Sequence, residues 1–127
     1  MYELVVSGNF AAAHNLRGYE GKCENLHGHN WKVEATLASD MLGPLGMVID
    51  FKDVKQALAS VLERYDHRYL NEVDDFKEIN PTTENMGRII CERLAGKLPE
   101  HVSVRSVAVW ESERCCARYV RPETDDR

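Results

Sequence analysis

Residues 29–39 read H-N-W-K-V-E-A-T-L-A-S, and this stretch decides the predicted fold. Apolar and polar side chains alternate in it, with Trp31, Val33, Ala35 and Leu37 on the apolar face. A period of two over seven residues is typical of a β-strand with one buried face. Residues 2–13 are also apolar and β-prone, and the glycine-punctuated residues 15–22 separate the two runs. We therefore expect two antiparallel strands joined by a long loop.

Two helices are predicted after these strands. In residues 47–65 the apolar side chains recur at helical spacing, and Asp50 is a good N-cap. A second helix follows P-T-T-E-N at residues 81–85, with Thr82 or Thr83 as its cap, and runs to about residue 96 or 98. Residues 102–120 then read as two strands around a short turn at residues 111–114. The predicted element order is β-β-α-α-β-β.

This order predicts an α+β fold in which a four-stranded antiparallel sheet carries both helices on one face. The 127 residues fit a single domain, residues 1–127, with one core. Five apolar side chains suggest more apolar sheet surface than two short helices would cover: Val5, Phe10, Val33, Val107 and Val109. We therefore expect homo-oligomerisation through the sheets.

Composition excludes several functional classes. The formal net charge is −5, and the 16 Lys and Arg are scattered, which argues against a nucleic-acid or membrane-surface protein. The N-terminus lacks a signal-peptide pattern and no apolar run approaches transmembrane length, so we expect a cytoplasmic protein. The four cysteines include no C-x-x-C pair, and we interpret them as thiols rather than disulfides or a four-cysteine zinc site. Proteins that act on small molecules and proteins that bind other proteins remain possible.

Three histidines form the candidate metal site. His27 and His29 are two residues apart at the start of a strand, so both imidazoles leave the same face. His14 ends the preceding strand, and antiparallel pairing brings its ring close to theirs. Three neutral imidazoles on rigid strands are the ligand set of a catalytic zinc, which keeps its fourth position open for water or substrate.

Cys23 lies four residues before His27, in the loop beside this site. A thiol has an unperturbed pKa of about 8.5, and a nearby divalent cation lowers it until the thiolate is available as a base or nucleophile. The spacing C-x-x-x-H-x-H also fits a closed zinc site with Cys23 as fourth ligand. Cys23 is therefore either a catalytic base beside an open zinc site or the fourth ligand of a closed, structural one.

Three further residues are candidates for acid–base or binding roles. Asp66 and His67 follow the first helix, where a carboxylate beside an imidazole suits proton transfer, although a surface histidine fits equally well. Glu111 follows an apolar strand, and its carboxylate can accept two hydrogen bonds from an amino-pyrimidinone ring. The alternative for Glu111 is an ordinary turn residue.

Six segments together resemble one family. They are N-F-A-A-A-H-N-L (9–16), K-C-E-N-L-H-G-H-N-W (22–31), V-I-D-F (48–51), Y-D-H-R-Y-L-N (65–71), P-T-T-E-N (81–85) and V-W-E-S (109–112). In this order they are similar to the 6-pyruvoyltetrahydropterin synthase family. The three residues between Cys23 and His27 resemble its bacterial 6-carboxy-5,6,7,8-tetrahydropterin synthases of queuosine biosynthesis, because the animal pyruvoyl enzymes have a longer gap there.

The resemblance implies a T-fold, assembled as trimers or dimers of trimers with active sites between subunits. It implies Zn²⁺ on His14, His27 and His29. For the other site residues it implies Cys23 as general base, His67 with Asp66 as its relay, Glu111 as the pterin anchor, and Glu24, Thr82 and Thr83 as further substrate contacts. The implied reaction converts 7,8-dihydroneopterin triphosphate to 6-carboxy-5,6,7,8-tetrahydropterin, acetaldehyde and triphosphate.

Other activities remain open. Some family members use a glutamate at E-x-x-H to cleave dihydroneopterin-type substrates toward folate, and Glu24 stands at that spacing before His27. The pyruvoyl synthase activity is a further alternative, and a closed structural zinc module is the alternative outside the enzymes. Lys22, Arg17 and Arg68 are the cations nearest in sequence for a triphosphate, although surface solvation is the commoner fate of such residues.

Overall fold

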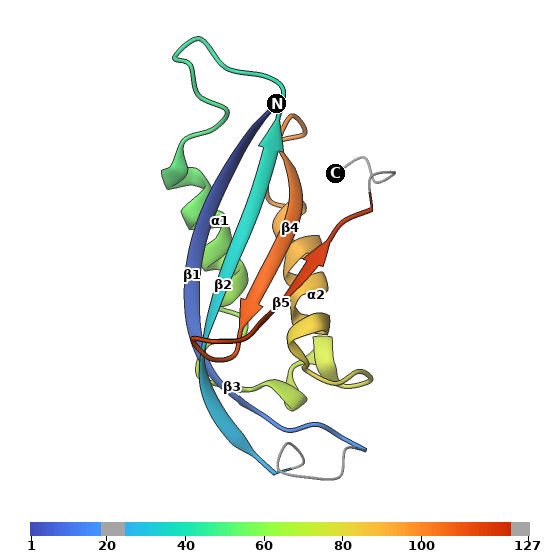
Figure 1. The fold of residues 1–127 in the computed structure, drawn as a ribbon. Coiled ribbons are helices and arrows are strands. Elements are labelled where there is room, and N and C mark those ends of the chain that lie inside the picture. Colours follow the sequence, from blue (N-terminus) through green and yellow to red (C-terminus); the bar gives the residue numbers. More distant parts are fainter. Residues whose placement is uncertain (19–24, 123–127) are drawn as a thin grey trace.

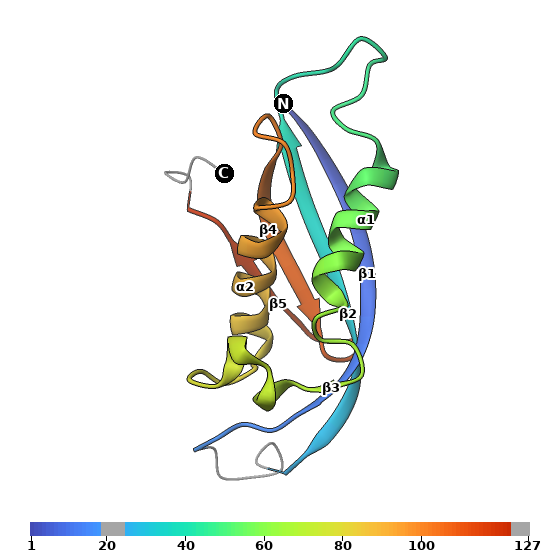
Figure 2. The ribbon, with the colours of Figure 1, turned by 180° about the vertical axis from the view of Figure 1, so that it is seen from behind.

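The computed structural model describes residues 1–18 and 25–122 as a five-stranded sheet with two helices against it (Figure 1). Figure 2 shows both helices on one face. The strands are β1 (Tyr2–His14), β2 (His27–Ser39), β3 (Arg68–Tyr69), β4 (Ser103–Trp110) and β5 (Cys116–Val120). The helices are α1 (Phe51–Leu62) and α2 (Thr83–Ala95), with 3₁₀ turns η2 (Leu70–Glu72) and η3 (Asp74–Phe76) between them.

The α+β prediction is confirmed, with one added strand. The sheet order is β3-β1-β2-β4-β5, and β3 pairs parallel with β1 through Ala12 and Ala13. The His67 backbone N–H also donates to the Ala11 carbonyl oxygen at 2.6 Å. Two residues show no periodicity, so the sequence predicted four strands and not this fifth one.

The predicted helix starts are confirmed by their caps. The Asp50 carboxylate accepts a hydrogen bond from the Lys52 backbone N–H at 2.9 Å, and the Thr82 hydroxyl accepts one from the Asn85 N–H at 3.1 Å. Each side chain satisfies a backbone donor that the first helical turn leaves unpaired. α1 ends at Leu62, earlier than expected, but Tyr65 beyond it is still fully buried.

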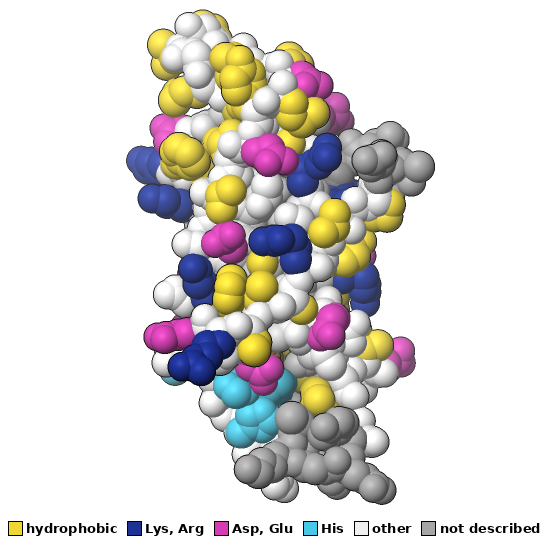
Figure 3. All heavy atoms as spheres, viewed as in Figure 1, with side chains coloured by type: hydrophobic (Ala, Val, Ile, Leu, Met, Phe, Trp, Pro, Cys, Tyr) yellow, Lys and Arg dark blue, Asp and Glu magenta, His cyan; other side chains and the backbone are white. Residues whose placement is uncertain are grey.

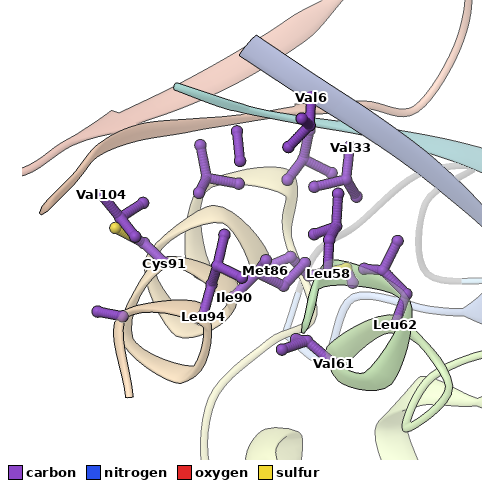
Figure 4. Close-up of a cluster of buried hydrophobic side chains, with 14 of the residues drawn as sticks. Val6, Val33, Leu58, Val61, Leu62, Met86, Ile90, Cys91, Leu94 and Val104 are labelled. Carbon is purple, nitrogen blue, oxygen red and sulfur yellow. The ribbon is translucent and has the colours of Figure 1, made fainter. Parts of the chain in front are cut away.

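The core lies between the sheet and the two helices (Figure 4). Val6 and Val33 face it from the sheet, opposite Leu58 of α1 and Ile90 of α2. Four of the five side chains expected to leave an uncovered apolar face are buried in this core: Phe10, Val33, Val107 and Val109. That expectation was wrong because these residues all point to the helix side of the sheet. Only Val5, 53% exposed, points away from the core.

Within residues 1–18 and 25–122, both edges of the sheet are open along most of their length. β1 has 13 residues, of which only Ala12 and Ala13 pair with β3 on the outer side. At the other edge, β4 is the only strand paired with β5 within the described part of the chain. Unpaired edges expose backbone donors and acceptors to other chains. None of the helices in residues 1–18 and 25–122 is long and apolar enough to cross a membrane.

Candidate metal centre

The three histidines gather where β1 ends and β2 begins, at one end of the molecule (Figure 3). His14 is the direct partner of His27 in the antiparallel ladder, and His29 is the partner of Ala12. Alternation along the strands gives all three rings the same face as the core residue Trp31. Their predicted role as metal ligands stays a prediction, but the geometry provides the convergence that such a role needs.

Glu111 completes this group. Its Oε1 lies 3.1 Å from His14 Nε2, 2.8 Å from His29 Nε2 and 3.9 Å from His27 Nε2. One ligand atom from each of the four residues lies within 4.8 Å of the others. The sequence predicted Glu111 as a substrate contact but not its place among the imidazoles. Glu111 reaches the imidazoles because Lys32 of β2 pairs with Trp110 of β4, which brings the end of β4 beside the histidines of β2.

Backbone carbonyls fix the orientation of two rings. His14 Nδ1 lies 2.9 Å from the Pro81 carbonyl oxygen, and His27 Nδ1 lies 2.7 Å from the Asn25 carbonyl oxygen. A carbonyl oxygen only accepts, so each Nδ1 carries the proton and donates. In the neutral tautomer, the Nε2 lone pairs then point toward the shared centre, as is usual for metal-binding histidines.

The donor set fits a divalent cation. A neutral imidazole donates from one nitrogen only, so His14, which faces an acceptor at each nitrogen, needs an added proton or a metal cation. His29 Nε2 is buried and lacks a hydrogen-bond partner of suitable geometry, although Glu111 is close. Burial lowers the pKa of His29, and the neighbouring His14 and His27 lower it further against the opposing effect of Glu111. A neutral imidazole is the form that binds zinc.

A rigid apolar floor lies under the histidines. Trp31 is fully buried, and its ring centroid is 4.8 Å from that of His14 and 5.4 Å from that of His29. Its indole N–H donates to the Ala12 carbonyl oxygen at 3.2 Å, and its ring stacks on Phe10. This packing restricts ring movement, so the ligand atoms are held in place before any ion binds.

Asp66 and His67 lie outside this group and form their own pair. His67 Nδ1 is 3.0 Å from Asp66 Oδ2, while Asp66 Oδ1 accepts a hydrogen bond from the Ala11 backbone N–H at 2.9 Å. That backbone hydrogen bond, followed by the His67 interaction, lowers the pKa of Asp66. The His67 side chain is 82% exposed and lines an open hollow of about 580 Å³ that also reaches Gly28 and His29.

His67 has a left-handed backbone, with φ of 58°. Among the described residues other than glycine it alone has a positive φ. Such a conformation is uncommon for a residue with a Cβ and occurs most often where the surrounding structure holds it. Here the His67 N–H donates to the Ala11 carbonyl oxygen and the Ala11 N–H donates to the Asp66 carboxylate, and these two bonds hold the segment against the edge of β1.

The remaining candidates are three residues before His27, two threonines at the start of α2, and two arginines. Lys22, Cys23 and Glu24 lie outside the described residues. Thr82 caps α2, and the Thr83 hydroxyl donates to Glu84 at 2.9 Å. Arg17 is not a free cation, because its guanidinium donates to the carbonyl oxygens of Asn71, Phe76 and Ile79. These carbonyls do not neutralise its charge and the residue is exposed, as is Arg68, so the suggested role of both cations in triphosphate binding stays a prediction.

Comparisons with known proteins agree on one family. The model of the 6-pyruvoyl tetrahydropterin synthase family matches residues 3–122. The 6-carboxy-5,6,7,8-tetrahydropterin synthase of Synechocystis is 38% identical, over 96% of this chain and 95% of that protein. The dihydroneopterin monophosphate aldolase of Pyrococcus furiosus is 34% identical, over 85% of this chain and 88% of that protein. The solved Caenorhabditis elegans 6-pyruvoyl tetrahydropterin synthase superposes with a TM-score of 0.84 at 28% identity, covering 95% of this chain and 96% of that one.

Proposed function

The chain belongs to the 6-pyruvoyl tetrahydropterin synthase family, and from this premise we propose that it is a zinc-dependent lyase. The reaction converts 7,8-dihydroneopterin triphosphate and water to 6-carboxy-5,6,7,8-tetrahydropterin, acetaldehyde and triphosphate, in queuosine biosynthesis. Several relatives at 29–38% identity carry the corresponding synthase name. A cytoplasmic location stays a prediction from the sequence.

The convergence of three imidazoles on one point is the observation that carries this proposal. His14, His27 and His29 would hold the zinc through Nε2, because the Nδ1 atoms of two of them are engaged with carbonyls. Zinc in such a site supplies Lewis-acid stabilisation of negative charge on substrate oxygens. Three protein ligands leave a position open for those oxygens, as catalytic zinc sites require.

We assign the two proton transfers to Cys23 and His67. Cys23, four residues before His27, removes a proton from the side chain of the substrate as thiolate. His67, paired with Asp66 at 3.0 Å, returns a proton as the triphosphate departs and the carbon–carbon bond breaks. Asp66 keeps its charge through the Ala11 N–H, so it can stabilise the imidazolium.

Glu111 is proposed as the anchor of the pterin ring. Once the imidazole nitrogens are bound to a cation, its carboxylate is free to accept two hydrogen bonds from the amino-pyrimidinone edge. Its side chain is 36% exposed, which leaves it accessible to a ligand. Thr82 and Thr83 lie next to Pro81, whose carbonyl oxygen contacts His14, so they border the same centre and are proposed as further substrate contacts, together with Glu24.

The active unit is proposed to be a trimer or a dimer of trimers with inter-subunit sites. The open edges of β1 and β5 supply unpaired backbone groups through which sheets can join. His67 is largely exposed and does not belong to the group around Glu111. Within an assembly, an exposed His67 is available to the centre of a neighbouring subunit.

The identity of the released aldehyde tests the reaction. Purified zinc-loaded protein incubated with 7,8-dihydroneopterin triphosphate should release acetaldehyde and form the 6-carboxy product, detected by derivatisation and mass spectrometry. Glycolaldehyde would instead indicate the folate-directed cleavage, which Glu24 and the Pyrococcus aldolase support as the second candidate. Recovery of the 6-pyruvoyl product would identify the third activity.

Metal coordination tests the non-enzymatic alternative. A closed structural site would have four protein ligands, with Cys23 or Glu111 bonded to the ion and no exchangeable water. X-ray absorption spectroscopy of the zinc-loaded protein distinguishes three nitrogens plus water from a sulfur-containing shell. A zinc–sulfur bond near 2.3 Å would overturn the role of Cys23 as base.

A further inference from the structure

Two asparagine side chains hold the end of β1 from outside the sheet. Asn71 Oδ1 accepts a hydrogen bond from the Asn15 backbone N–H at 3.0 Å, and its Nδ2 donates to the Asn15 carbonyl oxygen at 2.9 Å. Asn71 is only 8% exposed, and Tyr69 donates its hydroxyl to the Asn15 side chain. A side-chain amide here pairs with a backbone as a neighbouring strand would.

Asn80 makes the same pair of hydrogen bonds with the backbone of Arg17, two residues after Asn15. Its Oδ1 accepts from the Arg17 N–H at 2.9 Å and its Nδ2 donates to the Arg17 carbonyl oxygen at 3.0 Å. Arg17 returns the interaction, because its guanidinium donates to the carbonyl oxygens of Asn71, Phe76 and Ile79. We call these interlocked residues the asparagine clasp: Asn15, Arg17, Asn71 and Asn80.

The clasp encloses both ends of one metal-site hydrogen bond. His14 directly precedes Asn15, and Pro81 directly follows Asn80. His14 Nδ1 donates to the Pro81 carbonyl oxygen at 2.9 Å, the contact that leaves Nε2 for a metal. The Asn80 carbonyl oxygen is itself held by the Thr82 N–H at 2.9 Å and the Asn85 side chain at 2.8 Å. The Asn80 side chain ties this segment to the Arg17 backbone, three residues after His14, and so holds the Pro81 carbonyl at a fixed place relative to His14.

We propose that Asn71 and Asn80 are positioning residues that orient His14 toward the metal. The inference rests on the proposed function, since it needs zinc at the histidines. Residues that orient a metal ligand through its second nitrogen commonly change affinity about 10–100-fold when removed. Loss of either amide frees the end of β1 or the Pro81 segment, so that His14 Nε2 no longer meets His27 and His29 at a fixed point.

Zinc affinity of Asn80→Ala and Asn71→Ala, measured by chelator competition, tests this proposal. We expect a zinc dissociation constant at least about 10-fold above that of the wild type. The visible spectrum of the cobalt-substituted protein should change as well, since it reports ligand geometry. Asp74→Asn is the matched control: it breaks an exposed pair with Lys77 at 2.9 Å in the same connecting segment, outside the clasp, and should bind zinc normally.

The outcomes separate positioning from simple stabilisation. Thermal unfolding and circular dichroism of the metal-free variants identify any unfolded fraction, and Asn80→Ala decides alone if Asn71→Ala does not fold. A lower melting temperature with unchanged zinc affinity and cobalt spectrum would overturn the proposal. Wild-type protein that binds no zinc would overturn both this inference and the proposed function. Wild-type protein that binds zinc but releases no acetaldehyde would overturn only the reaction.

Discussion

His14 and His27 are direct cross-strand partners, with ring centroids 4.5 Å apart and ring planes at 63°. Two imidazoles at this separation on paired strands share one environment, and Glu111 adds a carboxylate to it. The hydrogen-bonded ladder fixes the spacing of the two backbones from which the rings extend. A cation bound between them would compensate the lone pairs of the ring nitrogens that this pairing brings together.

Removing one ligand should remove the metal without unfolding the chain. His29→Ala deletes a side chain that is 25% exposed at the end of the sheet, so we expect a small change in stability. Zinc affinity should fall by more than about 100-fold, beyond the usual effect of losing an outer hydrogen bond. Metal analysis after dialysis measures this. Asn30→Ala, on the adjacent position of β2, is the control and should retain zinc.

The loop thiol should matter for turnover and not for metal binding. Cys23→Ala is expected to keep zinc and to lower kcat by about 10²–10⁴-fold, the range for a lost general base. Zinc content and steady-state release of acetaldehyde are measured on the same preparation. Normal turnover in this variant would exclude the assigned role, and loss of zinc would favour the closed site.

Local patterns predicted the histidine group and marked Glu111 as a candidate, but they did not place Glu111 beside the imidazoles. The spacing of His27 and His29 and the antiparallel return to His14 need only one hairpin, so the alternation in residues 29–39 was sufficient. Glu111 reaches the group only through pairing of β2 with β4, whose register shifts between Thr36 and Leu37. No local pattern encodes that register.

Two other features depend on tertiary contacts in the same way. The segment after α1 forms β3 because Ala11 bonds to Asp66 and His67, and no propensity indicates this. The three backbone carbonyls that accept from the Arg17 guanidinium are more than fifty residues away in sequence, so no local pattern indicates these bonds. The sequence pattern identified which strand residues are apolar but not that Phe10 and Val107 share the helix face.

Two substitutions of His67 should separate the role of its imidazole in turnover from the effect of its left-handed backbone on stability. Asn tolerates a left-handed φ, so His67→Asn should fold with stability within about 0.5 kcal/mol of the wild type. It lacks an imidazole, so turnover should fall about 10²–10⁴-fold. His67→Val should destabilise by about 1–2 kcal/mol, because a β-branched residue disfavours φ of 58°. Chemical denaturation and kinetics measure the two effects, and a fully active His67→Asn would contradict the acid role.

Asp75 should make stability depend on pH in acid. Its side chain is 5% exposed and accepts from Arg64, Arg93 and the Tyr65 hydroxyl. Burial opposes ionisation, but these donors outweigh it and hold the pKa of Asp75 well below its usual range. The stabilisation is thus complete above the unfolded pKa of about 3.9 and is lost as pH falls toward the folded pKa. We expect Asp75→Asn to cost about 3 kcal/mol at pH 7, as for a broken buried ion pair.

The pH profile of unfolding distinguishes this network from an ordinary surface pair. Urea denaturation between pH 7 and pH 2 should show a flatter acid dependence for Asp75→Asn than for the wild type, because the carboxylate that must be protonated is absent. Asp74→Asn removes an exposed acid one residue away, whose pKa is lowered only by the exposed Lys77 pair and nearby charges, so it should flatten the slope below pH 4 much less than Asp75→Asn does. Equal slopes for wild type and Asp75→Asn would show that Arg64 and Arg93 do not stabilise the charged form of Asp75.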